Sequence, residues 1–341
     1  MDLRSAAAVL SGRASARRYW RVVRAGFPVV LPVPPEPPRQ RASFSADFLY
    51  TLTTDEVRMA AFRRAIAARG ARRLLEVGCG PWTPLLDMAL ASGAEEVVAV
   101  EATPAHLAVA RRRLAAEVRR GRVTLLEGRL GGAEGEAALP DGFRPDVVVA
   151  ELLGYTASEE GAPAVFAELQ RRFGPLPAIP RAACSLAVPV RPLALSFRDC
   201  WRNWCVHSYW PSPGRLIPGR LYDVRNLPRS LELAEPQVWE AFDFQGPGLE
   251  AQLQQQRELT FEVSPGEQVG GLLLWMRTEV DEGNTLDTRE HETSWNQYYL
   301  HLPALSAGPS GRLAVHVTVD ARSAEPFCEF GVGGVTYRIL G

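Results

Sequence analysis

Short apolar runs alternate with helix-like stretches between residues 74 and 151. The apolar runs are LLEV (Leu74–Val77), VVAV (Val97–Val100), VTLL (Val123–Leu126) and DVVVAE (Asp146–Glu151), and the helix-like stretches are Pro84–Ser92 and Pro104–Arg120. Strands that alternate with amphipathic helices predict βαβ units, and near-continuous β-branched runs predict a parallel sheet buried on both faces. We therefore expect a doubly wound, Rossmann-like α/β domain.

A helix and an extended connector are predicted ahead of this domain. Within Asp55–Ala68, the apolar residues Met59, Phe62 and Ile66 recur at i, i+3 and i+7, which is one face of a helix. The segment Val30–Arg41 is too rich in proline for a helix or a central strand. The first thirty residues are rich in Ala and Arg and predict an amphipathic helix, with a transit peptide as the alternative.

The rhythm of the chain changes after Pro175-Leu176-Pro177. Strand-like segments follow without long helices between them, namely SLAVPV, ELTFEV, GGLLLWM, QYYLHL and RLAVHVTV. This pattern predicts an antiparallel β domain, either a barrel or a sandwich. The expected organisation is an N-terminal helix and connector over residues 1–41, a cofactor domain over 42–178 and a β domain over 179–341.

Length and composition favour a two-domain protein of the cytoplasm. At 341 residues the chain exceeds the usual size of a single hydrophobic core. A net charge of −1 argues against an extended nucleic-acid footprint.

The five cysteines form no Cys-x-x-Cys pair, so neither a zinc ribbon nor a complete disulfide framework is suggested. No apolar run approaches the ~18–20 residues that span a bilayer. We therefore expect no metal, membrane or nucleic-acid partner.

The first strand of the α/β pattern leads into a glycine-rich turn. Gly78 and Gly80 follow LLEV directly, and Glu101 stands at the end of the next strand, 21 positions after Gly80. Such glycines let a backbone approach a ligand, and such an acid can bind the two hydroxyls of a ribose. Position 83 is Thr, so the full Gly-x-Gly-x-x-Gly motif of a pyrophosphate cradle is missing. S-adenosyl-L-methionine, which carries adenosine without phosphates, therefore fits better than NAD. The alternative is a plain tight turn.

Two glutamates stand in the loop ELLGYTASEEG after the last predicted strand of the α/β domain. Glu151 and Glu160 are nine positions apart, and ligands of open α/β sheets bind at this edge. Two carboxylates brought together repel each other unless a cation lies between them. A planar guanidinium is such a cation. The alternative is that Glu159 and Glu160 cap a helix beginning near Gly161. We expect Glu159 to be a cap, leave Glu160 open and favour a functional role for Glu151.

From about Asp47 to its C-terminus, the chain resembles the protein arginine methyltransferases. The matching stretches are DEVR (Asp55–Arg58), LLEVGCG, VVAVE, VTLLEG, ELLGYTASEE, LAEPQVWEAFDF and TSWNQYYL. The resemblance implies an S-adenosylmethionine-dependent enzyme that methylates a guanidinium nitrogen of arginine in a protein or peptide.

The resemblance also assigns individual residues. It implies that Glu151 and Glu160 grip the substrate guanidinium, and that Ser294 and Trp295 line the arginine pocket. Trp295 as an ordinary buried tryptophan is the alternative. The residues implied to bind the cofactor are Arg58, which holds the methionine carboxylate, together with Gly78, Gly80, Glu101 and Gly128.

The chain departs from the family pattern at two positions. Ser294 replaces a histidine that pairs in the family with an acid matching Asp55, so this contact is expected to be weaker or rebuilt. Trp82 replaces a small residue of the glycine loop. The tyrosines of the family's closing helix have only approximate counterparts in Phe44, Phe48 and Tyr50. These departures leave open a methyltransferase for a small metabolite or natural-product peptide, and also a non-catalytic dimeric scaffold.

A dimer is expected from an arm in the β domain. Family members dock such an arm on the cofactor domain of a second subunit. The segment Trp201–Pro228 has a suitable position, and its aromatic residues Trp201, Trp204, Tyr209 and Trp210 suit an interface. The alternative is that these aromatics pack within their own subunit.

Overall fold

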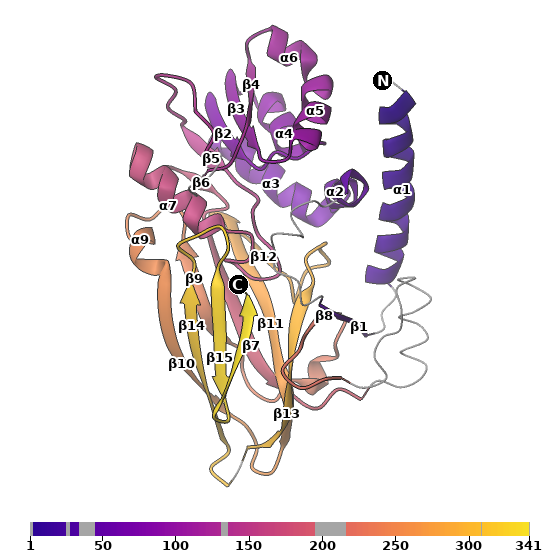
Figure 1. Cartoon of the computed structure of the whole chain (residues 1–341), viewed down its shortest axis with the longest axis vertical. Coiled ribbons are helices and arrows are strands. Elements are labelled where there is room, and N and C mark those ends of the chain that lie inside the picture. Colours follow the sequence, from indigo (N-terminus) through magenta and orange to yellow (C-terminus); the bar gives the residue numbers. More distant parts are fainter. Residues whose placement is uncertain are drawn as a thin grey trace.

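The computed structural model describes residues 3–24, 28–33, 45–130, 136–194, 216–307 and 309–340. Figure 1 shows an α/β domain at one end of the molecule and long antiparallel strands at the other. The N-terminal helix α1 (Leu3–Val23) lies alongside them. None of the described helices is long and apolar enough to cross a membrane.

The α/β domain contains a five-stranded parallel sheet. Its strands are β2 (Arg73–Val77), β3 (Glu96–Glu101), β4 (Val123–Glu127), β5 (Val147–Val149) and β6 (Ala178–Ile179). They lie in the order β4-β3-β2-β5-β6, and every pairing is parallel. The helices are α3 (Glu56–Arg69), α4 (Pro84–Ala91), α5 (Pro104–Arg113), α6 (Ala115–Arg119) and α7 (Ala162–Phe173). The predicted Rossmann-like fold is confirmed.

Two elements of this domain differ from the pattern-based prediction. The single helix expected over Pro104–Arg120 is interrupted at Leu114, whose backbone lies at φ −96° and ψ 13° while its side chain is buried in the core. The strand expected over Asp146–Glu151 contains only three residues, Val147–Val149. Asp146 instead accepts hydrogen bonds from the backbone N–H groups of Arg72 and Arg73. Glu151 is thereby left in the loop that follows the strand.

The β domain consists of two antiparallel sheets, as predicted. The larger sheet has the order β1-β8-β13-β11-β7-β9, with β12 added beside β11. Its strands are β1 (Val29–Pro32), β7 (Ala182–Val190), β8 (Leu221–Arg225), β9 (Gln237–Asp243), β11 (Gln268–Asp281), β12 (Asn284–Asp287) and β13 (Gln297–Ser306). The smaller sheet has the order β10-β14-β15-β16, formed by Gln254–Glu262, Arg312–Asp320, Phe327–Val332 and Val335–Leu340. Short helices are η2 (Arg229–Leu231) and α9 (Leu249–Gln252).

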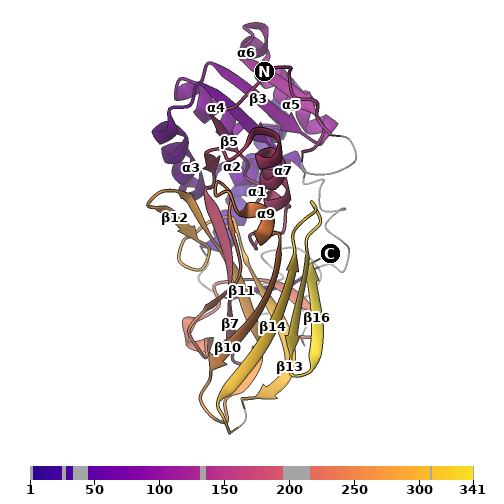
Figure 2. The same cartoon turned by 90° about the vertical axis from the view of Figure 1, so that its left-hand side faces the viewer.

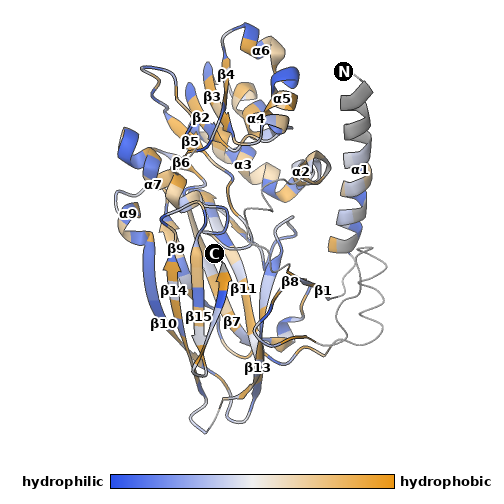
Figure 3. Cartoon of the chain, viewed as in Figure 1, coloured by the Kyte–Doolittle hydropathy of each residue, from blue (hydrophilic) through white to orange (hydrophobic). Residues whose placement is uncertain are grey.

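The two β sheets bury an aromatic core between them. Trp239 of β9 and Phe330 of β15 meet edge to face, with ring centroids 5.1 Å apart, and both are fully buried. Figure 2 shows the strands of both sheets running along the long axis of the molecule. Strand β10 is largely hydrophilic in Figure 3, because only Leu259 and Phe261 of its nine residues are buried. Burial of one face in each sheet therefore holds this domain together.

The N-terminal segment is built into both domains. Strand β1, within the region expected to be a connector, pairs antiparallel with β8 at the edge of the larger sheet. An edge position suits a proline-containing strand. Helix α1 crosses α2 (Ala46–Thr53) so closely that a Cβ on Gly12 would lie 2.7 Å from the ring of Tyr50. Trp20 of α1 also donates a 2.9 Å hydrogen bond to Thr54.

Candidate active site

The order of the strands reverses between β2 and β5, and the region outside the carboxyl ends of these two strands is called the β2–β5 crevice below. The chain builds the sheet outward from β2 through β3 to β4, and then returns to the other side of β2 for β5 and β6. Ligands of such sheets bind outside the carboxyl ends of the strands at this reversal. The loop after β2 contains Gly78 and Gly80, and the loop after β5 contains Glu151. The glycine loop and the glutamate loop predicted from the sequence therefore flank one crevice.

The two glycines of the first loop have different roles. Both adopt a positive φ, +78° at Gly78 and +63° at Gly80, which favours glycine. A Cβ on Gly78 would lie 2.8 Å from the side chain of Leu152, so this glycine lets the glutamate loop approach β2. A Cβ on Gly80 would meet no atom of the described residues within 4 Å. Gly80 therefore leaves room for a ligand close to the backbone.

Glu101 holds the glycine loop at the end of β3. Its Oε2 accepts a 2.9 Å hydrogen bond from the backbone N–H of Gly80, and its Oε1 accepts a 2.7 Å bond from that of Thr103. His106 lies 3.8 Å from the same carboxylate. A carboxylate has about four lone-pair sites, so Glu101 retains capacity for two ligand hydroxyls. The backbone N–H of Gly128, which follows β4, bonds to the Glu101 carbonyl at 3.1 Å.

A second buried acid, Glu76, stands within β2 and was not singled out from the sequence. It is 1 % exposed, and its Oε2 has no hydrogen-bond partner among the described residues. Burial, followed by the charges of Asp87 and Glu101, raises the pKa of Glu76 to about 8. The sequence signal that could have found this residue is an acid within the apolar run LLEV. Glu76 offers a ligand donor an acceptor near the end of β2, two positions before Gly78.

Arg58 connects α3 with the glutamate loop. Its Nη1 donates to Glu151 Oε1 at 3.3 Å, and its Nη2 donates to the Leu52 carbonyl at 2.9 Å. The guanidinium also lies over the ring of Trp295, 5.1 Å from the centroid. The side chain is 2 % exposed, and Nε has no hydrogen-bond partner among the described residues. Three of the residues expected in the site, Arg58, Glu151 and Trp295, are therefore in mutual proximity.

The two glutamates of the loop differ in their surroundings. Glu151 is paired with Arg58 and half-buried, whereas Glu160 is exposed. Desolvation raises the pKa of both carboxyls above their usual range. The charges of Glu151 and Glu159 raise the pKa of Glu160 further, whereas Arg58 opposes the rise for both. A cation placed beside Glu160 would relieve this repulsion.

Glu159 does not cap the following helix. Helix α7 has Gly161 at its N-cap and no side-chain cap bond, so the capping role expected for Glu159 is wrong. Glu159 Oε2 accepts a 2.7 Å hydrogen bond from the backbone N–H of Tyr155, and Oε1 accepts from the Tyr298 hydroxyl of β13. The side chain folds back over its own loop because Gly154 has no Cβ to obstruct it.

The contact between position 294 and Asp55, which was expected to be weaker or rebuilt, is made by the backbone of Ser294. The Ser294 N–H donates a 2.6 Å hydrogen bond to Asp55 Oδ2, while Asp55 Oδ1 accepts from the N–H of Arg58 at 2.9 Å and caps α3. Tyr19 of α1 donates to the Ser294 carbonyl at 2.7 Å. Trp295 donates its indole N–H to the Leu153 carbonyl at 3.0 Å. Backbone and indole bonds thus connect this turn of the β domain with both α3 and the glutamate loop.

Trp82 connects the glycine loop with α2. It is 7 % exposed, and its indole N–H donates a 2.7 Å hydrogen bond to the Ala46 carbonyl at the start of α2. Tyr50 meets the indole edge to face at 5.4 Å. Phe48, also on α2, is 36 % exposed, whereas Phe44 lies outside the described residues. The large side chain therefore packs against α2.

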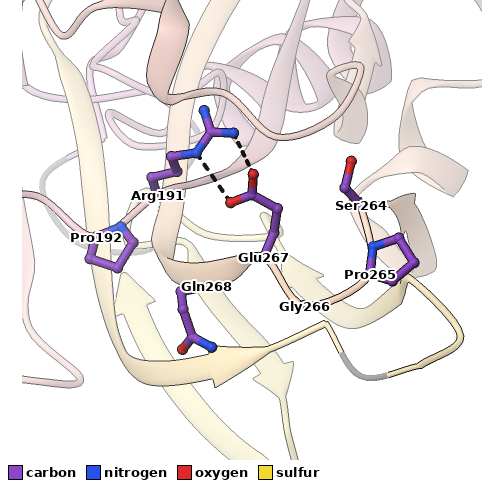
Figure 4. Close-up of a pocket in the computed structure, with 7 residues that line it drawn as sticks. All are labelled: Arg191, Pro192, Ser264, Pro265, Gly266, Glu267 and Gln268. Atoms are coloured by element: carbon purple, nitrogen blue, oxygen red, sulfur yellow. Dashed lines mark hydrogen bonds and ion pairs between the residues drawn. The ribbon is translucent and has the colours of Figure 1, made fainter.

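Two hollows lie away from this crevice. One of about 430 Å³ is bordered by Arg191 and Glu267, which form the paired hydrogen bonds drawn in Figure 4. It follows the end of β7, and nine strand residues separate it from the parallel sheet, roughly 30 Å. The other, about 660 Å³, lies beside Cys184 and Ala241. Burial raises the pKa of the Cys184 thiol to about 11. Neither hollow is lined by Glu151 or Glu160.

Some expected features fall outside the described residues. The aromatic part of the expected arm, Trp201, Trp204, Tyr209 and Trp210, is among them. Within the parts of the chain that the structure describes, no group of three or more His, Cys, Asp or Glu side chains is arranged to hold a metal ion.

Comparison with known proteins identifies the fold. No protein-family model and no curated protein matches the sequence. Among solved structures, protein arginine methyltransferase 10 of Arabidopsis thaliana superimposes with a TM-score of 0.60 at 18% identity, over 89% of this chain and 97% of that chain. The Trypanosoma brucei PRMT1 enzyme–prozyme heterotetramer with AdoHcy matches with a TM-score of 0.58 at 17% identity, over 85% and 95%. The resemblance seen in the sequence is confirmed at the level of the fold.

Proposed function

We propose that the protein is an S-adenosylmethionine-dependent methyltransferase that acts on a guanidinium nitrogen of arginine in a protein or peptide. The observation that carries the proposal is the convergence of two loops on the β2–β5 crevice. One loop is suited to adenosine, and the other holds Glu160, whose pKa is raised and which pairs with no cation among the described residues. The fold shared with arginine methyltransferases supports the same assignment.

The residues of the crevice fit the proposed cofactor. Gly80 leaves open space beside the backbone, and Glu101 has acceptor capacity for ribose hydroxyls. The free Oε2 of Glu76 suits a donor such as an ammonium group, and Arg58 suits a carboxylate. Gly128 lies beside Glu101 at the same sheet edge. When bound, S-adenosylmethionine supplies an activated methyl group. One solved neighbour contains AdoHcy, which is consistent with this choice.

The glutamate loop would bind and orient the acceptor. Glu151 and Glu160 accept hydrogen bonds from the N–H groups of the substrate guanidinium, and their charges offset its desolvation. Paired bonds fix the plane of the guanidinium and leave one nitrogen directed at the methyl group. Orientation of this kind can supply several kcal/mol of rate enhancement, about 7–11 in favourable cases. Trp295 closes the pocket behind Arg58 and contributes an aromatic wall.

A proton must leave the guanidinium when the new N–C bond forms. The raised pKa of Glu160 makes its carboxylate a better proton acceptor than an ordinary glutamate. Its exposed side chain then lets the proton pass to solvent. Glu151 remains paired with Arg58, so its charge is neutralised from the other side. The two carboxylates would therefore share binding but differ in proton transfer.

We also propose a homodimer that acts in the cytoplasm. One structural neighbour is a heterotetramer, and the aromatic composition of residues 201–228 suits an interface. Cys79, Cys184 and Cys328 are free thiols, which fits a reducing compartment. Sedimentation of the full chain would test the dimer.

Labelled cofactor and arginine-containing peptides test the proposed reaction. We expect label transfer to a guanidinium nitrogen, located by mass spectrometry, and a loss of transfer in Glu151→Gln. Transfer only to another kind of atom would favour a small-molecule or natural-product acceptor. Absence of cofactor binding in calorimetry would favour a non-catalytic scaffold. The arginine proposal fails if the parent methylates no arginine and Glu151→Gln behaves like the parent on the true acceptor.

A further inference from the structure

Glu160 stands in a hydrogen-bonded turn. The Gly161 N–H donates to the Ser158 carbonyl at 2.9 Å, which makes Glu159 and Glu160 the central residues of a four-residue turn. Gly161 completes the turn at φ +82°. The position of Glu160 therefore depends on where Ser158 is held.

Ser158 is held by a buried carboxylate of the β domain. Its N–H donates to Glu240 Oε1 at 3.3 Å. The hydroxyl of Ser185 donates to the same oxygen at 2.6 Å and accepts a 2.8 Å hydrogen bond from the Ala157 N–H. Two successive backbone N–H groups of the loop are thus bound by one Glu–Ser pair.

The register of the larger β sheet directs Ser185 and Glu240 toward the glutamate loop. Ser185 of β7 and Glu240 of β9 are register partners, and the register shifts immediately beyond them. A bulge of this kind redirects side chains, and it accounts for the burial of both Trp239 and Glu240, which are neighbours in sequence. Ser158, Ser185 and Glu240 are all 0% exposed. The pair is therefore rigidly enclosed.

Burial of the Glu240 carboxylate is unfavourable for the stability of the fold. A buried carboxylate without a paired cation is unfavourable, and among the described residues Glu240 has no such cation and its Oε2 has no hydrogen-bond partner. Burial raises the pKa of Glu240 to about 7, while Ser185 and Ser158 lower it in part. Among the described residues, the titratable groups that interact electrostatically with Glu240 are the thiols of Cys184 on β7 and Cys328 on β15, whose own pKa values are raised by burial. Both thiols are neutral at pH 7, so the site's ionisation near this pH belongs to Glu240.

We propose that Glu240, together with Ser185, is a positioning residue that sets the place of Glu160 in the active site. The inference rests on the proposed role of Glu160 and assigns part of the catalytic geometry to the β domain. An ionised Glu240 accepts stronger hydrogen bonds than a protonated one, so it holds the turn more firmly. A displacement of about 1 Å at a reacting group can cost 10²-fold in rate.

Four variants test this role. We expect Glu240→Ala and Ser185→Ala to lower kcat by about 10- to 100-fold, with the dissociation constant of the cofactor unchanged. Glu240→Gln retains an acceptor oxygen, so it should recover most of kcat and lose the ionisation near pH 7 from the pH profile. Thr278→Ala is the matched control, because Thr278 is an equally buried strand hydroxyl whose one hydrogen bond to the described residues is donated to the Ala182 carbonyl.

Hydrogen exchange provides a readout that does not need activity. Exchange at the amides of Ala157 and Ser158 should accelerate in Glu240→Ala and Ser185→Ala and stay at the parental rate in Thr278→Ala. Parental exchange in both Ala variants, or parental kcat with only a lower melting temperature, overturns the positioning role. If the parent methylates no arginine, the proposed function fails, and the exchange data still decide whether Glu240 holds the loop. Ser185→Ala and Glu240→Gln keep the test decisive if Glu240→Ala does not fold.

Discussion

The two loops of the crevice are held by residues at different separations along the chain. The glycine loop is held by Glu101, which lies 21 positions from Gly80 and belongs to the same sheet. The glutamate loop is held by Arg58, Asp223, Glu240 and Tyr298, at separations of 93, 68, 82 and 139 positions. The cofactor side is therefore organised within one domain, whereas the acceptor side depends on both. Changes in the β domain should consequently affect acceptor methylation more than cofactor binding.

The strongest test of this division is Glu160→Gln. The neutral amide cannot offset the guanidinium charge or take its proton, so we expect kcat to fall about 10²- to 10³-fold. The dissociation constant of the cofactor should stay at the parental value. Single-turnover rates and calorimetry measure the two effects. Glu262→Gln, which changes an exposed ion pair on β10, is the control. Equal losses in rate and cofactor affinity would contradict the separation of the two loops.

The converse test is Glu101→Ala on the cofactor side. Loss of charged hydrogen bonds costs about 1.5–3 kcal/mol, so we expect the dissociation constant of the cofactor to rise about 10- to 100-fold. Hydrogen exchange in residues 155–162 should remain parental, because none of the bonds that hold this loop involves Glu101. Glu96→Ala is the matched control, since Glu96 lies on the same strand in an exposed pair with Arg73. Faster exchange in the glutamate loop would show that the two loops are coupled.

The order of elements was predictable because its signals are local. Apolar runs with period-breaking glycines and prolines predicted the parallel sheet and the antiparallel domain, and both are confirmed. The break at Leu114 was missed because a two-helix unit has the same apolar periodicity as one helix. Strand β1 was missed because its pairing with β8 joins residues almost 200 positions apart.

The contents of the site were predictable only in part. The glycines and Glu101 lie in recognisable spacings, and the glutamate pair follows from one loop. Glu159 was assigned to a helix cap because an acid before a helix is the usual signal, whereas the hydroxyl of Tyr298 that binds it comes from a distant strand. Glu240 had no local signal at all, because a glutamate in an alternating strand is normally exposed. Tertiary contacts therefore determine the roles of Glu159 and Glu240.

The pH dependence should distinguish free enzyme from the acceptor complex. The raised pKa of Glu160 means that its proton is bound at pH values where an ordinary glutamate has ionised. Activity requires the ionised form, so kcat/KM should fall tenfold for each pH unit below that pKa. A bound guanidinium favours the carboxylate, so the same fall in kcat should lie at lower pH. Stopped assays of methyl transfer over a range of pH measure the profiles of kcat/KM and kcat. Glu160→Gln should remove the part of this fall that belongs to Glu160 and keep the ionisation of Glu240 near pH 7. A fall that is unchanged in this variant would be assigned to Glu151 or Glu240.

The smallest expected effect concerns the link between the glycine loop and α2. Trp82→Phe removes the indole bond to the Ala46 carbonyl while keeping an aromatic ring near Tyr50. A net hydrogen bond contributes about 0.5–1.5 kcal/mol, so we expect cofactor affinity to fall about 2- to 10-fold. Tyr50→Phe retains the ring contact and is the control. Because α2 belongs to the cofactor side, hydrogen exchange at Ala157 and Ser158 should be unchanged. Parental affinity in Trp82→Phe would show that α2 is held chiefly by α1, through the close approach of Gly12 to Tyr50.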